Sequence, residues 1–262
     1  MTRPRTALTI AGSDSGGGAG IQADLKSFSA RGVFGASAIT AITAQNTVGV
    51  TAIHPIPTDV VAAQISAVLD DIGADAVKIG MLASADIIHA VADALEGYGG
   101  PIVLDPVMVS KSGDALLAEE AVAALRDRLI PRATVLTPNL PEAARLTEKP
   151  VAAIAEQASL LRGMGARAVI MKGGHGTGET CCDRLFAETA MDCESPRIDT
   201  RNTHGTGCSF SAALAAEMAK GESLETAFAT SHAWLHRAIV AASDEQLGAG
   251  HGPVRHFVDF WS

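Results

Sequence analysis

Aromatic residues are scarce in this chain, and long apolar runs are missing. Phe, Trp and Tyr make up 4% of the 262 residues, whereas hydrophobic residues make up 47%. This composition excludes a disordered chain and is typical of one globular domain, here residues 1–262, whose core is built from small aliphatic side chains. The apolar run at residues 7–10 is too short for a signal peptide, and no stretch approaches a membrane helix. We therefore expect a cytoplasmic protein with no membrane partner.

An excess of basic residues is also missing. Lys and Arg number 20 against 29 Asp and Glu, which gives a formal net charge of −9. Binding nucleic acid broadly requires a basic face that displaces phosphate counterions, so we expect no nucleic-acid partner. The four cysteines form no C-x-x-C pair, so Cys181, Cys182 and Cys193 are interpreted as free thiols rather than zinc ligands.

What the sequence does contain is an alternation of short apolar runs with amphipathic segments, with no linker and no internal repeat. This alternation predicts an α/β fold in which a mostly parallel central sheet carries helices on both faces. The predicted strands are residues 6–10, 37–43, 76–79, 102–104, 134–136 and 168–171, and residues 181–197 resemble a β-hairpin. The predicted helices are residues 21–30, 59–70, 85–95, 119–129, 141–146, 152–164, 207–219 and 224–242.

Polar side chains follow several of these strands at the point where each strand ends. Asp105, Lys172 and Gln45 come directly after apolar runs, and Asn139 and Glu142 follow the run that ends at residue 136. Ligands of open parallel sheets bind outside the carboxyl ends of the strands, so these side chains should converge there. Each of them alone could equally be a cap or a turn residue.

Two glycine-rich segments each lead into a predicted helix. In residues 11–20 the glycines permit close backbone approach to a ligand, but the spacing G-x-G-x-x-G is not met and Asp14 would put a negative charge near a pyrophosphate. A flexible connection is the alternative. In residues 202–213 the N–H groups at residues 205–208 begin a helix and predict an anion hole for a transferring phosphoryl group. The Walker pattern is absent from the chain.

Cys208 lies in the first turn of that helix. The helix dipole should lower the pKa of its thiol, although a buried small apolar residue is an equally good interpretation. In residues 137–143, Pro141 suits a first helical turn, and Glu142 could either hold magnesium through water or complement the helix dipole. Lys172 leaves a buried strand into glycines, where it could meet a phosphate or lie on the surface.

Taken together and in order, these segments resemble the hydroxymethylpyrimidine/phosphomethylpyrimidine kinase family of the ribokinase-like superfamily. The resemblance extends from about residue 8 to residue 257 and rests on residues 10–26, 44–47, 78–82, 104–108, 137–143, 171–175, 202–208 and 250–256. It implies a three-layer fold, a homodimer, magnesium, and ATP as co-substrate. It also implies two successive phosphorylations, first of 4-amino-5-hydroxymethyl-2-methylpyrimidine and then of its monophosphate, in thiamin biosynthesis.

The resemblance also implies a role for each site residue. The pyrimidine would contact Gln45, Gly12 and Met81, with Asp24 as a weaker candidate, and the ATP would contact Lys172, Asn139 and His204. Asp105 and Glu142 would bind magnesium. Gly205, Thr206 and Gly207 would form the anion hole, with Cys208 beside it as a base or charge partner.

Three alternatives remain open. A pyridoxal kinase of the same structural group is the nearest, and Gln45 argues against it because an amide both donates and accepts, as the N–C–N edge of an aminopyrimidine requires. An inactive nucleotide-binding regulator is disfavoured because every expected phosphate and metal residue is present. An NAD-dependent oxidoreductase would need a clean glycine fingerprint and a ribose-binding acid, and the sequence offers neither convincingly.

Overall fold

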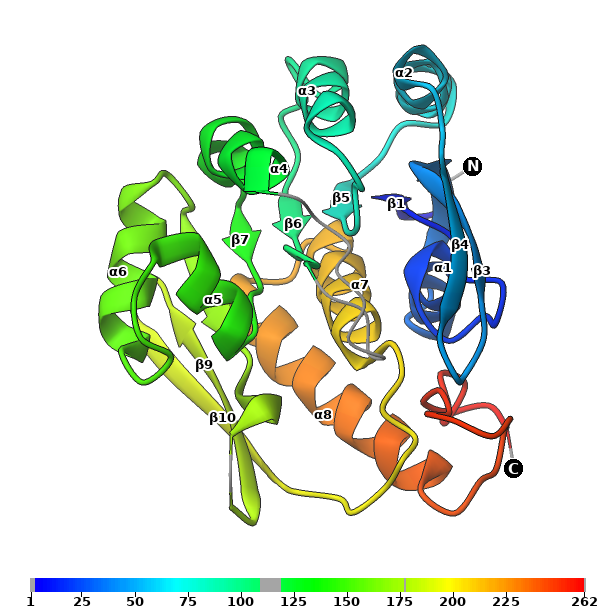
Figure 1. Ribbon diagram of the computed structural model, residues 1–262, viewed down its shortest axis with the longest axis vertical. Coiled ribbons are helices and arrows are strands. Elements are labelled where there is room, and N and C mark those ends of the chain that lie inside the picture. The colour runs from blue at the N-terminus through cyan, green and yellow to red at the C-terminus, as the bar shows by residue number, and fades with distance from the viewer. Residues whose placement is uncertain (1–2, 109–118, 177, 262) are drawn as a thin grey trace.

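A central sheet of eight strands organises the part of the chain described by the computed structural model, residues 3–108, 119–176 and 178–261 (Figure 1). The strand order is β10-β9-β8-β7-β6-β5-β1-β2. Six neighbouring strands, β8, β7, β6, β5, β1 and β2, run parallel, and β9 and β10 form an antiparallel hairpin at the edge. The bounds are β1 Thr6–Ala11, β2 Phe34–Ile39, β5 Ala76–Ile79, β6 Ile102–Leu104, β7 Val135–Leu136, β8 Ala168–Met171, β9 Thr180–Phe186 and β10 Ala190–Pro196.

Helices cover both faces of this sheet. On one face α2 to α6 pack against strand residues such as Leu8 and Ile79, and on the other α1, α7 and α8 pack against Ala7 and Val103. Successive strand side chains point to opposite faces, so both faces must be apolar, as the strand sequences are. The bounds are α1 Gly20–Ala30, α2 Thr58–Ala67, α3 Ala85–Ala94, α4 Glu119–Ala124, α5 Leu140–Thr147, α6 Ile154–Gly163, α7 Thr206–Ala219 and α8 Leu224–Ala242. The predicted three-layer α/β fold is confirmed.

The strand register brings the carboxyl ends of the parallel strands level with one another. Ile10 pairs with Ile79, Ile79 with Leu104, and Leu104 with Leu136, so each strand ends at the same edge of the sheet. Residues that follow these strands therefore meet along that edge, as parallel sheets require.

One predicted strand is wrong. Residues 37–43 do not form a single strand, because β2 ends at Ile39 and the chain leaves the main sheet at Thr40. The next strand, β3 (Ala41–Gln45), pairs antiparallel with β4 (Val50–Pro55) in a separate two-stranded sheet (Figure 1). The sequence did not predict β4, because its side chains are largely exposed and lack the apolar run of a buried strand. Gln45 therefore reaches the site from a hairpin, not from the end of a parallel strand.

Within the described ranges, no helix combines the length and the apolar character needed to cross a membrane.

Candidate active site

A cavity of about 670 Å³ lies at the carboxyl edge of the sheet. It is lined from one end by Gln45 on the β3–β4 hairpin and from the other by Lys172 after β8. Every residue that the sequence assigned to a site, except Asp24, lines this cavity: Gly12, Gln45, Met81, Asp105, Asn139, Glu142, Lys172, His204, Gly205, Thr206, Gly207 and Cys208. The long-range convergence inferred from the strand ends is therefore present.

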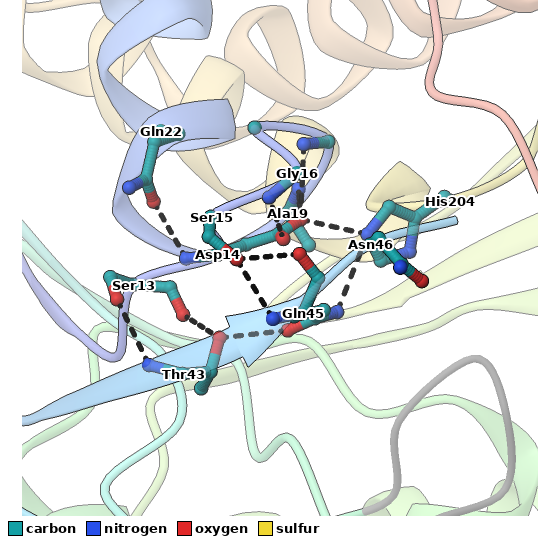
Figure 2. Close-up of polar contacts among 12 residues, drawn as sticks. Ser13, Asp14, Ser15, Gly16, Ala19, Gln22, Thr43, Gln45, Asn46 and His204 are labelled. Carbon is teal, nitrogen blue, oxygen red and sulfur yellow. Dashed lines mark hydrogen bonds and ion pairs between the residues drawn. The ribbon is translucent and has the colours of Figure 1, made fainter. Parts of the chain in front are cut away.

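At the end of the cavity near the hairpin, the first glycine-rich loop wraps around its own carboxylate. Asp14 Oδ1 accepts from the backbone N–H of Gly16 at 2.8 Å, and Oδ2 accepts from Gly18 at 3.0 Å and Ala19 at 2.8 Å (Figure 2). Burial by itself would raise the pKa of Asp14, but hydrogen bonds from His204 and from the loop amides lower it overall. The loop amides are thus occupied by Asp14 and do not form a pyrophosphate cradle.

Gln45 is held on both its backbone and its side chain. Its N–H donates to Ser15 Oγ at 2.8 Å, and its side-chain amide lies 3.3 Å from Thr43 Oγ1 and 3.4 Å from His204 Nε2 (Figure 2). Beside it, the N–H of Gly12 donates to the carbonyl of Met81 at 3.1 Å, and a Cβ at Gly12 would overlap the Met81 methyl group. The Met81 side chain therefore fills the space beside Gly12, and both residues line the cavity together with Gln45.

The anion-binding turn at the start of α7 lines the same cavity. Gly205 has φ +73°, and a Cβ there would overlap the carbonyl oxygen of Gly18, so this position accepts only glycine. The first N–H groups of α7 have no carbonyl partner within the helix and add to its dipole. A Cβ at Gly207 would lie 3.2 Å from Lys172 Nζ and 3.6 Å from Asp105 Oδ2, so the turn faces these two charges.

Buried charges concentrate at this end. Lys172 Nζ lies 2.7 Å from Asp105 Oδ1, and Asp105 also accepts from Thr137 Oγ1 and Ser211 Oγ, each at 3.3 Å. Burial alone would lower the pKa of Lys172, but the charges of Asp105 and Glu142 raise it. Burial, together with the charge of Asp105, raises the pKa of Glu142 to about 7 although Lys172 opposes this. Two carboxylates thus share one ammonium group.

Asn139 and Glu142 also form the N-cap of α5. Asn139 Oδ1 accepts from the Glu142 N–H at 2.8 Å, and Glu142 Oε2 accepts from the Asn139 N–H at 2.8 Å. This is the capping role that the sequence left open for Glu142. The capping bond uses the side-chain oxygen of Asn139, so only its NH₂ group can serve a phosphate.

Two sequence-based expectations need correction. Asp24 does not line the cavity, because it is fully buried and binds Lys78 Nζ at 3.0 and 2.9 Å through its two oxygens. Cys208 does not have a lowered thiol pKa: burial, with the nearby carboxylates, raises it to about 11, although Lys78 acts the other way. His204 contacts Asp14 Oδ2 at 2.8 Å and the Gln45 amide at 3.4 Å, and the ATP contact that the resemblance implies for it stays a prediction.

Lys78, which is fully buried yet lines the cavity, was not predicted as a site residue. A lysine inside the otherwise apolar strand β5 is the sequence feature that could have indicated it. Burial alone would lower the pKa of Lys78, but the Asp24 carboxylate raises it. The pair therefore brings a permanent positive charge beneath Cys208, with Asp24 as its counter-charge.

A doubly covered parallel sheet whose carboxyl edge carries a helix-start anion hole beside buried charges is the architecture of a ribokinase-like small-molecule kinase. The comparisons with known proteins then narrow this class. A family model described as phosphomethylpyrimidine kinase matches residues 14–255. The chain belongs to the phosphomethylpyrimidine kinase family.

Named relatives agree with this membership. The chain is 53% identical over 260 residues to a hydroxymethylpyrimidine/phosphomethylpyrimidine kinase of Rhizobium meliloti, covering 97% of this chain and 98% of the relative. It is 50% identical over 261 residues to the protein of that name in Escherichia coli, covering 97% and 98%.

Solved structures of this fold include kinases with two different names. A Clostridium difficile phosphomethylpyrimidine kinase has a TM-score of 0.79 and 42% identity, covering 89% of this chain and 99% of its own. A Bacillus subtilis pyridoxal kinase, solved as an ADP complex, has a TM-score of 0.88 and 41% identity, covering 97% of each chain. The expected family and fold are confirmed, and the two names set the question of substrate.

Proposed function

We propose that this chain uses ATP to phosphorylate 4-amino-5-hydroxymethyl-2-methylpyrimidine and then phosphorylates the monophosphate to the diphosphate, as a cytoplasmic enzyme of thiamin biosynthesis with one kinase domain over residues 1–262. One observation carries this proposal: Gln45 and the turn at residues 205–208 face the same cavity. An amide that can pair with an aminopyrimidine edge thus lines the same cavity as an anion hole that can hold the terminal phosphate of a nucleotide.

In the first reaction the hydroxymethyl oxygen attacks the γ-phosphorus and gives up its proton to water or to a phosphate oxygen, the bond to the β–γ bridging oxygen breaks, and ADP leaves. In the second reaction a phosphate oxygen of the monoester attacks a second ATP. Lys172, the NH₂ group of Asn139 and the α7 amides would hold the phosphates during transfer. Burial raises the pKa of the Cys208 thiol to about 11, so at neutral pH the thiol keeps its proton and does not act as a base. Positioning and charge stabilisation carry most of such a transfer.

Magnesium fits this end of the cavity as a partner of the nucleotide. Within the described ranges, no group of three or more His, Cys, Asp and Glu side chains could hold a metal ion. Mg²⁺ commonly uses one or two carboxylates together with waters and substrate phosphates, and Asp105 and Glu142 supply that number. The raised pKa of Glu142 marks a site where a further positive charge would be stabilising. Bound there, the ion would neutralise charge on the phosphates.

Phosphorus NMR with Mg·ATP separates this function from its rivals. The aminopyrimidine alcohol should give first a monoester signal and then a diphosphate signal. Pyridoxal is the second candidate substrate, because solved relatives at 41% and 33% identity carry the name pyridoxal kinase. Phosphorylation of pyridoxal alone would overturn the proposal, and turnover of both compounds would leave the ratio of kcat/KM values to define the main substrate.

A homodimer is the proposed assembly. Large apolar side chains are exposed on the edge strand β2 and on the β3–β4 hairpin, namely Phe34, Ile42, Val48 and Ile53. A second copy of the chain would cover them. Light scattering should give twice the mass of 26.8 kDa, and Ile42→Lys with Ile53→Lys should shift the protein towards monomer. A wild-type monomer at micromolar concentration would contradict this assembly.

A further inference from the structure

The side-chain amide of Gln45 has two possible orientations, and its neighbours decide between them. Oxygen and nitrogen of an amide are assigned from the hydrogen-bond network, since the atoms have nearly the same shape. In one of these orientations, which Figure 2 draws, Nε2 of Gln45 lies 3.4 Å from His204 Nε2 and Oε1 lies 3.3 Å from Thr43 Oγ1. The hydrogen bonds that His204 and Thr43 already make determine which amide atom can face each of them.

The ring hydrogen of His204 that faces this contact is donated to Asp14. His204 Nε2 lies 2.8 Å from Asp14 Oδ2, and both side chains are buried. Three loop amides already donate to this carboxylate, which favours its ionised form and leaves it able only to accept. His204 must therefore carry its hydrogen on Nε2, and a protonated ring nitrogen has no lone pair to accept from an amide NH₂. The Gln45 atom that faces His204 must be oxygen.

The hydroxyl hydrogen of Thr43 is likewise donated to a backbone carbonyl. Thr43 Oγ1 donates its one hydrogen to the carbonyl oxygen of Ser13 at 2.8 Å. Thr43 can then only accept from Gln45, so the Gln45 atom that faces it must be the NH₂ group. Two independent neighbours thus require the same orientation, with the amide oxygen of Gln45 at His204 and its nitrogen at Thr43.

We propose that His204, held in its Nε2–H form by Asp14, is a positioning residue that fixes the orientation of the Gln45 amide and thereby the substrate selectivity of the site. In this orientation the amide offers the cavity one N–H and one oxygen lone pair. An aminopyrimidine edge presents the complement, an amino N–H beside a ring nitrogen lone pair, whereas pyridoxal has no amino group next to its ring nitrogen. This inference rests on the proposed function and names a selectivity determinant for it.

The kinetic test compares His204→Phe, which keeps a ring but removes the N–H, with His204→Gln, which restores a donor. In His204→Phe the KM for the aminopyrimidine alcohol should rise at least tenfold, and its preference over pyridoxal should fall by a similar factor. The KM for ATP should stay within twofold. His204→Gln should recover most of the lost preference. His89→Phe, on the exposed surface of α3, is the matched control and should leave all values unchanged.

A loss of structure would raise both KM values or lower kcat without changing the preference between substrates, and that result would overturn the proposal. A measurement that needs no turnover tests the premise directly. Nitrogen-15 NMR of the His204 ring at pH 8 should report Nε2 protonated and Nδ1 unprotonated, and Asp14→Asn should change that pattern. The opposite tautomer in the wild-type protein would refute the amide orientation. Absence of any turnover of the aminopyrimidine would instead refute the proposed function, while the tautomer would still decide the orientation.

Discussion

The two ends of the cavity satisfy their polar groups in different ways. At the end near Gln45, the carboxylate of Asp14 binds loop amides and a histidine, and the amide of Gln45 lies against two side chains. At the end near Lys172, one ammonium group serves the two buried carboxylates of Asp105 and Glu142, and the pKa of Glu142 is raised to about 7. The first end is thus organised by hydrogen bonds around one carboxylate, whereas the second concentrates buried groups of both charges.

This difference indicates how the two ligands are recognised. A neutral ring brings no charge, so its site must be organised by the protein alone, with each hydrogen already directed. A nucleotide brings phosphates and a cation, so its site can leave part of the charge compensation to them. We therefore expect mutations near Gln45, the ring end, to alter substrate selectivity. Mutations near Lys172, the phosphate end, should alter the rate of phosphoryl transfer.

The largest effect should come from Gly207→Val. Branched carbons at this position would enter the space next to Lys172 Nζ, which a Cβ alone would approach to 3.2 Å. Blocking the anion hole should lower kcat by roughly 10³-fold or more, because hydrogen bonds to the transferring group are lost. An ADP-release assay measures this. Gly163→Val, where a Cβ meets open space at the end of α6, is the control. A fully active Gly207→Val enzyme would refute the role of the turn.

Lys172→Met should come next. We expect kcat/KM for ATP to fall about 100-fold, as for other removed electrostatic stabilisers, with the KM for the pyrimidine nearly unchanged. The variant should also lose about 3 kcal/mol of unfolding free energy, because Asp105 is left buried without its partner. Adding Asp105→Asn should restore stability but not activity, as urea unfolding and the ADP assay would report. Equal loss of stability in the double variant would contradict the paired charges.

Gln45→Ala probes the opposite end. Removing the amide should raise the KM for the aminopyrimidine by about 10- to 100-fold, in line with one or two lost hydrogen bonds, and leave the KM for ATP within twofold. Steady-state kinetics with each substrate varied in turn measures both values. Equal effects on the two substrates would erase the distinction between the ends.

The smallest effect concerns the C-terminal segment that supports the ring end. The His204 N–H donates to Gly252 at 2.9 Å, and farther along this segment the buried His256 ring contacts Ser209 Oγ at 2.9 Å. Burial, with a smaller effect of Lys26, lowers the pKa of His256 to about 4. Between pH 4 and 6.5 the unfolded state binds the proton and the folded state does not, so stability falls as pH falls through 6.5.

The cost of this buried imidazole should be about 2 kcal/mol at pH 5 relative to pH 7.5. Urea unfolding at the two pH values measures it, with His256→Gln as the comparison because glutamine can still pair with Ser209 and does not titrate. The variant should lose less stability on acidification than the wild type. An identical pH dependence in both proteins would show that folding does not lower the pKa of His256.

Many residues of the site could be predicted from the sequence because their positions follow from the local pattern of apolar and polar residues. Asp105 and Lys172 follow apolar strand runs, and parallel strands end at one edge, so their convergence needed only the fold class. The cap formed by Asn139 and Glu142 is likewise local, since three residues separate the two partners. Gln45 was the right residue in the wrong element, because the exposed strand β4 has no apolar pattern to reveal a hairpin.

The sequence by itself determined the layered fold, the strand-end residues and the helix that begins at the glycine-rich turn, because strand and helix periodicity act over a few residues. Only the tertiary structure decided that Asp24 neutralises Lys78, that burial raises the pKa of Cys208, and that His204 contacts both Asp14 and Gln45. These properties depend on burial and on partners 54 or more residues apart along the chain, and local pattern carries no record of either.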